Sequence, residues 1–326
     1  MPSCDGEYGW PPDKDGRLVI SDSVTSIGNL AFAGCTGLID VAIPESVISI
    51  RAGAFKECDG LTAVAIPNSV TSIGSRAFAS CTVLTAMVTP DSVTSIGEYA
   101  FAGCTSLTAV VISNAVASTA EGAFYDCSGL TVLTIPESVT SIGVEAFNGC
   151  TGLTAMTISD SVTLIGNLAF AGCTGLIDVA IPESVISIGE YAFAGCTRLI
   201  AVSIPDSVTS IADGAFHSCA SLTKITIQDE SKVEFNPASI IGDTAATIVN
   251  LAAEELRYIA ECPKLQMAQF SNAGALADRR TTSVFDADQA KEAKVLNHQD
   301  HPPSPCICIW IPASLAFSYH HHHGCC

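Results

Sequence analysis

Apolar and polar positions alternate over short stretches of the chain, and the same stretch returns after every 23 residues. In one clear copy Leu38, Val41 and Ile43 are apolar. Ala42 lies between the last two and should face outward, and Pro44 follows, so the pattern predicts a short strand that ends at the proline. A sharp turn, a second short extended piece and a tight helical or 3₁₀ turn should complete each repeat.

An Ala-Phe pair marks each repeat, with a cysteine three residues after the phenylalanine. The nine phenylalanines are Phe32, Phe55, Phe78, Phe101, Phe124, Phe147, Phe170, Phe193 and Phe216. A fixed period of this length predicts a solenoid, in which each repeat buries its apolar face on the next one. A glycine usually precedes the pair, as at Gly28 and Gly74, and we expect it to supply a backbone angle that other residues resist.

The repeats divide the chain into four expected segments. These are an N-terminal cap at 1–17, a solenoid of nine 23-residue repeats at 18–227, a C-terminal cap with one helix at 228–270, and a flexible tail at 271–326. The cap helix is expected at about 248–262, where Leu251, Leu256 and Ile259 are spaced for one helical face. The cap should cover the apolar end of the stack.

One repeat departs from the pattern. Ser113 stands where proline is usual, and Thr119 and Thr89 each replace an isoleucine. Drift that a stack tolerates explains these changes, and a soft point near the middle of the stack is the alternative. Elsewhere the copies are almost interchangeable: residues 20–50 and 158–188 match at 30 of 31 positions. Interchangeable repeats argue against one repeat holding a unique catalytic group.

Charge excludes several kinds of partner. The formal net charge is −19, and residues 21–220 hold only four lysines and arginines against seventeen acids. Such a surface repels phosphates, so we expect no nucleic-acid partner, and an anionic membrane surface is disfavoured for the same reason. No apolar run approaches the ~18 residues of a spanning helix, so no membrane insertion is expected. The absence of a visible signal sequence in Met1 to Trp10 favours a cytoplasmic location.

Nine of the fifteen cysteines form one column at the 23-residue spacing, from Cys35 to Cys219. Equivalent side chains in neighbouring repeats point the same way, which makes disulfide geometry hard to reach. We expect buried free thiols that act as small apolar side chains. Metal binding is the alternative, but a row of thiolates without histidine fits it badly.

The repeat Ile66-Pro-Asn-Ser-Val-Thr-Ser-Ile-Gly74, followed by Ala77-Phe78, Cys81 and Leu84, resembles the BspA-like, or Treponema-type, leucine-rich repeats. The resemblance covers roughly residues 18–227. It implies a leucine-rich-repeat solenoid used for protein binding, and many members are cell-surface or adhesin-like proteins. On the resemblance, the expected location is therefore the cell surface.

Few residues suit catalysis. His217, the one histidine of the repeats, occupies a variable position, and we expect it to be a surface residue. An acidic column follows the proline, at Asp22, Glu45, Asp91, Glu137, Asp160, Glu183 and Asp206, with Asn68 and Asn114 in the gaps. These side chains suit hydrogen bonds to their own turn. A calcium ladder is the alternative, although one acid per repeat supplies too few ligands.

We therefore expect a monomeric, non-enzymatic scaffold that binds a protein or a glycan, without metal or cofactor. A structural or ice-binding rod is the alternative, suggested by the outward file Thr62, Thr85, Thr108, Thr131 and Thr154, and an enzyme is third. The candidate binding surface consists of exposed aromatic, basic and outward strand residues: Tyr99, Tyr125, Tyr191, Arg76, Arg198, Thr134 and Thr157.

Overall fold

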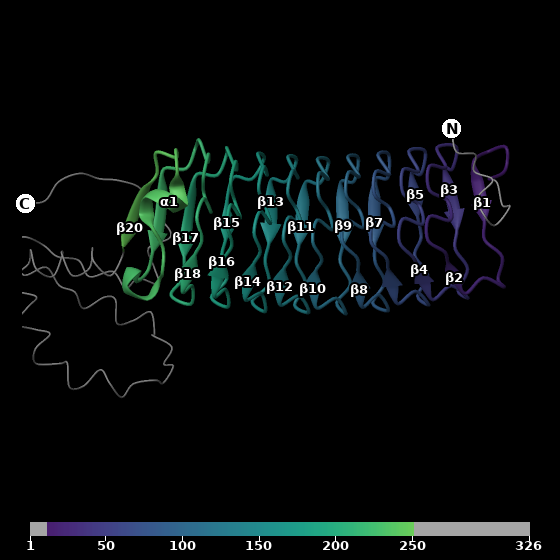
Figure 1. The fold of residues 1–326 in the computed structure, drawn as a ribbon, viewed down its shortest axis with the longest axis horizontal. Coiled ribbons are helices and arrows are strands. Elements are labelled where there is room, and N and C mark those ends of the chain that lie inside the picture. The colour runs from purple at the N-terminus through teal and green to yellow at the C-terminus, as the bar shows by residue number, and fades with distance from the viewer. Residues whose placement is uncertain (1–11, 251–326) are drawn as a thin grey trace, which may run out of the picture. The chain divides into compact units, whose positions relative to one another are not determined.

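The computed structural model describes residues 12–250, which stack short parallel strands one repeat upon the next (Figure 1). The stack has about 10 turns and repeats of about 23 residues, so the predicted parallel solenoid is confirmed. Each repeat contributes one main strand and one shorter second strand, and the two series run along the stack in chain order.

The main strands form three parallel sheet segments. They are β1 (Arg17–Val19), β3 (Asp40–Ala42) and β5 (Ala63–Val64); then β7 (Ala86–Val88), β9 (Ala109–Val111), β11 (Val132–Thr134) and β13 (Ala155–Thr157); then β15 (Val179–Ala180), β17 (Ala201–Ile204), β19 (Lys224–Ile227) and β20 (Thr247–Asn250). Paired residues lie 23 positions apart, as in Leu133 opposite Met156. The offset between paired residues in neighbouring strands therefore equals the period of the sequence.

The second strands form two further parallel segments. They are β2 (Ser26–Ile27), β4 (Ser49–Ile50), β6 (Ser72–Ile73) and β8 (Ser95–Ile96); then β10 (Ser118–Thr119), β12 (Ser141–Ile142), β14 (Leu164–Ile165), β16 (Ser187–Ile188) and β18 (Ser210–Ile211). In each of these strands the second residue is buried. The strand therefore adds one side chain per repeat to the core.

The repeat geometry continues beyond the last sequence repeat. A 3₁₀ turn, η1 (Glu230–Lys232), and a short helix, α1 (Pro237–Ile241), lead to β20, which pairs with β19 at the same 23-residue offset. The predicted helix at 248–262 is thus wrong for Ile248 to Asn250, which lie in a strand because β19 offers an open parallel edge. The rest of that helix and the tail at 271–326 lie outside the described residues, and the segment boundaries stay predictions.

The Ala-Phe segment is a series of turns rather than a continuous helical or 3₁₀ turn, although half of its hydrogen bonds have the three-residue span of a 3₁₀ turn. Around Phe55, every second backbone N–H donates to the carbonyl of the residue three positions earlier, as from Cys58 to Phe55 at 3.3 Å. The alternate N–H groups donate to the next repeat, as from Phe55 to the Ala77 carbonyl at 2.7 Å. Because φ is positive at Gly53 and Glu57, the chain cannot continue as a helix.

The role predicted for Gly74 is also wrong. Gly74 is not among the residues with positive φ, which instead lie two before and two after each phenylalanine, as at Arg76 and Ser80. Gly74 is small because the previous repeat is close: an added Cβ would lie 2.6 Å from the Ala52 nitrogen and 2.7 Å from the Arg51 carbonyl carbon.

The core is a set of aligned columns. The phenylalanine rings stack along the repeats with centroids 5.2–5.5 Å apart and interplanar angles of 2–16°. Columns of leucine, valine and isoleucine surround them and are buried, apart from Val24 and Ile43, which are partly buried. Ile240 of α1 is buried beyond Phe216, and its carbonyl accepts the Phe216 N–H at 2.8 Å. The aromatic column thus ends on an aliphatic side chain.

The nine cysteines of the repeats are buried thiols outside any disulfide bond, as predicted. From Cys58 onward each Sγ donates to the carbonyl of the phenylalanine 26 residues earlier, at 3.0–3.3 Å. Burial raises the pKa of Cys104 and of Cys150 from 9.0 to about 12. The thiol column therefore both packs and links neighbouring repeats by hydrogen bonds.

The irregular repeat satisfies its extra polar groups internally. Proline has no N–H, so Ser113 adds a donor that the repeats with proline at this position lack. That N–H donates to Thr89 Oγ1 at 2.8 Å, and Thr89 Oγ1 donates to the Val111 carbonyl at 3.0 Å. Both residues are buried, at 3% and 1% exposure for Thr89 and Ser113. The two departures from the repeat pattern therefore compensate each other.

This pairing predicts strong coupling between the two positions. Thr89→Ile restores an apolar residue but leaves the Ser113 N–H buried without its acceptor, at a cost of about 1–3 kcal/mol. Ser113→Pro removes that donor, so we expect the double variant to be at least about 1 kcal/mol more stable than the sum of the single effects. Urea unfolding of the four proteins measures the coupling. Additive effects would show that the two residues act independently.

Over residues 12–250 no helix is long and apolar enough to cross a membrane.

Candidate functional site

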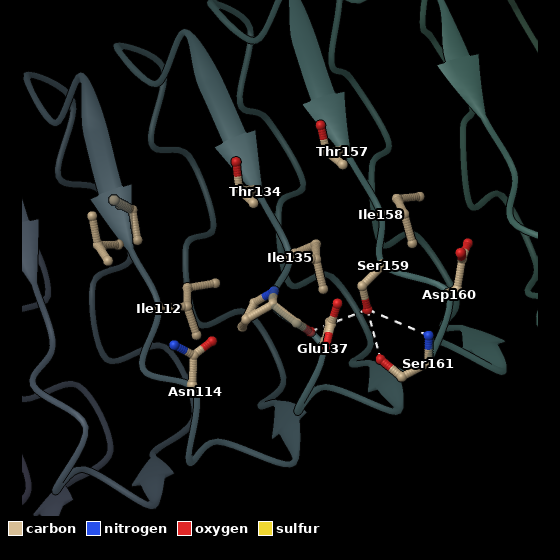
Figure 2. Close-up of a pocket in the computed structure, with 13 residues that line it drawn as sticks. Ile112, Asn114, Thr134, Ile135, Glu137, Thr157, Ile158, Ser159, Asp160 and Ser161 are labelled. Atoms are coloured by element: carbon tan, nitrogen blue, oxygen red, sulfur yellow. Dashed lines mark hydrogen bonds between the residues drawn. The ribbon is translucent and has the colours of Figure 1, made fainter.

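A groove of about 940 Å³ runs across three consecutive repeats (Figure 2). One side is formed by the ends of β9, β11 and β13, and the other by the turns that follow these strands. Buried Ile112, Ile135 and Ile158 line it at the strand ends. The groove therefore lies along the direction of stacking and presents equivalent residues from neighbouring repeats.

Thr134 and Thr157 project into the groove from the ends of β11 and β13 (Figure 2). Strand alternation turns these side chains outward, while Leu133 points into the core. Across the described chain, neither hydroxyl makes a hydrogen bond to another residue. Val111, 55% exposed, occupies the same outward position on β9 and gives this wall an apolar end.

The turn side of the groove carries Asn114, Glu137 and Asp160, all exposed (Figure 2). Their predicted hydrogen bonds to their own turns are not found: the turns close through the backbone, as from the Val139 N–H to the Pro136 carbonyl at 3.1 Å. Among residues 12–250 the carboxylates of Glu137 and Asp160 form no ion pair or hydrogen bond. They are available to a ligand.

Ser159 rigidifies the turn at one end of the groove. Its Oγ donates to the Pro136 carbonyl at 3.1 Å and lies 2.6 Å from Ser161 Oγ. Ser161 in turn donates to the Val139 carbonyl at 3.2 Å. Ser113 and Ser159 replace proline on either side of Pro136, but Ser21 does the same near the start of the stack, so this replacement alone does not distinguish the groove in the sequence.

Of the predicted binding residues, the structure brings Thr134 and Thr157 together and places the others elsewhere. Arg76, Tyr99 and Tyr125 form a separate cluster, with the Arg76 guanidinium 5.3 Å from the Tyr99 ring centroid and the two tyrosine rings 6.1 Å apart. Arg198 is exposed and is not among the residues that line the groove. No arginine or lysine lines it.

Tyr99 makes contacts within the stack. Its hydroxyl lies 3.0 Å from both Glu121 Oε1 and Glu145 Oε2, and its ring covers Gly122 of the next repeat. Desolvation, followed by the hydrogen bonds to Glu145 and Glu121, raises the pKa of Tyr99. Tyr99 thus links its own repeat to the two that follow.

Tyr191 packs against His217, with ring centroids 6.0 Å apart. His217 Nδ1 lies 2.9 Å from Ser218 Oγ, and Nε2 lies 3.6 Å from Asp243. In a serine-hydrolase triad the histidine separates the nucleophile from the acid. Here Ser218 donates directly to Asp243 through its backbone N–H at 2.8 Å and its hydroxyl at 3.2 Å. The cluster fastens the last turn to the stack and lacks the order of a triad.

The outward threonine file is used internally. The hydroxyls of Thr62, Thr85, Thr108, Thr131 and Thr154 each donate to the backbone carbonyl one repeat earlier, at 3.1–3.4 Å. These hydroxyl donors are already hydrogen-bonded between repeats and are not available to ice, which weakens the ice-binding alternative. Within the described part of the chain, no group of three or more histidine, cysteine or acidic residues is arranged to hold a metal ion.

A stack of 23-residue repeats with parallel strands and a leucine column defines a leucine-rich-repeat solenoid, and a surface groove is its candidate site. A model of the BspA type leucine rich repeat region matches residues 16–131 and 118–236, with six copies. The chain belongs to this family, and the resemblance seen in the repeats is confirmed. No curated protein matches the chain.

Several solved structures match this chain. A leucine-rich repeat protein from Bacteroides ovatus ATCC 8483 is 29% identical, with a TM-score of 0.65, over 72% of this chain and 60% of that one. A leucine rich cell surface protein from Faecalibacterium prausnitzii A2-165 is 27% identical, with a TM-score of 0.45, over 72% and 78%. The pneumococcal vaccine antigen PcpA is 18% identical, with a TM-score of 0.45, over 74% and 82%. The first of these supports the solenoid fold.

Proposed function

We propose that the protein is a non-enzymatic scaffold that binds a protein or glycan partner in the groove across β9, β11 and β13. The observation that supports this most directly is a set of polar side chains around the groove that are unpaired among residues 12–250, namely Thr134, Thr157, Glu137 and Asp160. The parallel strand pairing holds the backbone that carries these groups, so mainly side-chain freedom is lost when a partner binds. The family is one of repeat scaffolds, and an adhesin-like role is part of the same proposal.

The stack also explains why binding suits this surface better than catalysis does. Catalysis needs a base, a nucleophile and a stabilising donor that converge on one atom. Around the groove, hydroxyls and carboxylates are instead spread over three repeats, which suits many weak contacts with an extended partner.

Panning the full-length protein against a library of linear peptides and a glycan array tests the proposal. Thr134→Trp should block the groove and reduce binding of a selected ligand about tenfold or more. Ser203→Trp is the matched control, because Ser203 occupies the same outward position three repeats further on, in β17. Binding that survives Thr134→Trp, or no saturable binding by either library, would contradict the proposal.

A further inference from the structure

The acidic side of the groove carries information about the chemistry of its occupant. Glu137 and Asp160 are unpaired within residues 12–250, and no basic residue lines the groove. An uncharged occupant would desolvate these carboxylates without neutralising them, which is unfavourable. The repeats around the groove are acidic as well, with seventeen acids against four bases over residues 21–220.

The chain itself shows how a cation binds to this acidic column. Asp206 occupies the same position as Asp160, two repeats further on. Lys232, from η1 outside the sequence repeats, places its Nζ 3.5 Å from Asp206 and 3.4 Å from Asp229. Asp206 is also the main cause of the raised pKa of Lys232. A lysine from a non-repeat segment therefore already pairs with one member of the column.

We infer that the groove binds an extended, lysine-rich segment of a partner protein, whose ammonium groups pair with Glu137 and Asp160 as Lys232 pairs with Asp206. This inference rests on the proposed function and names the chemistry of the partner. The lysine stems lie along the apolar surface of Val111 and the strand ends, with their charged heads at the turns. The hydroxyls of Thr134 and Thr157 hydrogen-bond the partner's backbone.

The spacing of the repeats supports a linear occupant. Neighbouring parallel strands lie about 4.8 Å apart, so Glu137 and Asp160 offer two carboxylates one repeat apart along the groove, next to the amide of Asn114. Such a row suits a chain that lies along the stack and places successive cations against successive repeats (Figure 2). Long lysine side chains adjust to the interval, because their four-carbon stems are flexible.

The test uses a short synthetic peptide of alternating lysine and serine, labelled for fluorescence anisotropy, with the full-length protein. We expect saturable binding that weakens with added salt, and none by the peptide with glutamate in place of lysine. The double variant Glu137→Gln/Asp160→Asn should weaken binding about tenfold. The control is Asp22→Asn/Glu45→Gln, which removes the same charge from the same column outside the groove and should change binding less than about twofold.

Equal weakening in the two double variants would overturn the inference, because it would show attraction to the whole acidic surface instead of to the groove. Failure of the lysine peptide would also overturn it. If the libraries still yield a ligand whose binding is reduced by Thr134→Trp, the scaffold function stands with a different kind of partner. A neutral glycan would be one such ligand. If the libraries yield none, both proposals fall.

Discussion

Replacing Phe147 by alanine should destabilise the protein by about 3–5 kcal/mol, a large part of the stability of an ordinary domain. Phe147 is fully buried and stacks between Phe124 and Phe170, each with a centroid distance of 5.4 Å. Removing the ring leaves a cavity that the neighbouring rings cannot fill, because each is fixed by its own repeat. Urea unfolding followed by circular dichroism measures the loss.

Two variants separate this cavity effect from a general response to mutation. Phe147→Leu keeps much of the volume and should cost clearly less than the alanine variant. Phe32→Ala removes the first ring of the column, which is 5% exposed and stacks on Phe55 alone, so its cost should also be smaller. If Phe147→Ala lowers the free energy of unfolding no more than Phe32→Ala does, packing of a ring between two neighbouring rings adds nothing to stability.

The core could be predicted from the sequence because apolar residue types that recur at a fixed spacing indicate buried positions. Phe, Cys and Leu recur every 23 residues, and each proved to be a buried column. The irregular pair Thr89 and Ser113 was visible too, but not its hydrogen bond, because that depends on the offset between neighbouring repeats.

The errors have a common physical cause: they concern contacts between backbones. Gly74 was assigned a special backbone angle, whereas its small size accommodates the Arg51 and Ala52 backbone. Left-handed φ occurs at Leu30, Arg76 and Tyr99. These residue types rarely adopt it, so the sequence does not predict it there. Ile248 lies in β20, which pairs with β19 although it is beyond the last sequence repeat.

The candidate site was only partly predictable for the same reason. Thr134 and Thr157 were recognisable as outward strand residues, and the groove brings them together. Tyr99 was predicted to be a contact residue from its type, but the glutamates that bind it come from the next two repeats. The residue type and position of Glu137 and Asp160 predict hydrogen bonds to their turns, and only the folded stack reveals that they are unpaired within residues 12–250.

Raising the pH from 8 to 10 should destabilise the protein by roughly 10 kcal/mol through the thiol column alone. Burial raises the pKa of seven cysteines above 9.0, namely Cys81, Cys104, Cys127, Cys150, Cys173, Cys196 and Cys219. Above pH 9 an unfolded chain loses these protons, while the folded chain keeps them until at least about pH 11, the pKa of Cys219. The unfolded state then binds fewer protons, so the free energy of unfolding falls as the pH rises.

Between pH 8 and pH 10 each such thiol contributes about 1.4 kcal/mol to this loss. The total loss of stability is therefore proportional to the number of buried cysteines. Urea midpoints at pH 8, 9 and 10 measure it. Cys104→Val/Cys150→Val keeps the packing volume and should reduce the loss of stability between pH 8 and pH 10 by about 2.8 kcal/mol. Tyr99→Phe corrects for the phenol, whose raised pKa acts in the same direction. A urea midpoint that stays constant between pH 8 and pH 10 would show that the thiols are exposed or already ionised in the folded state.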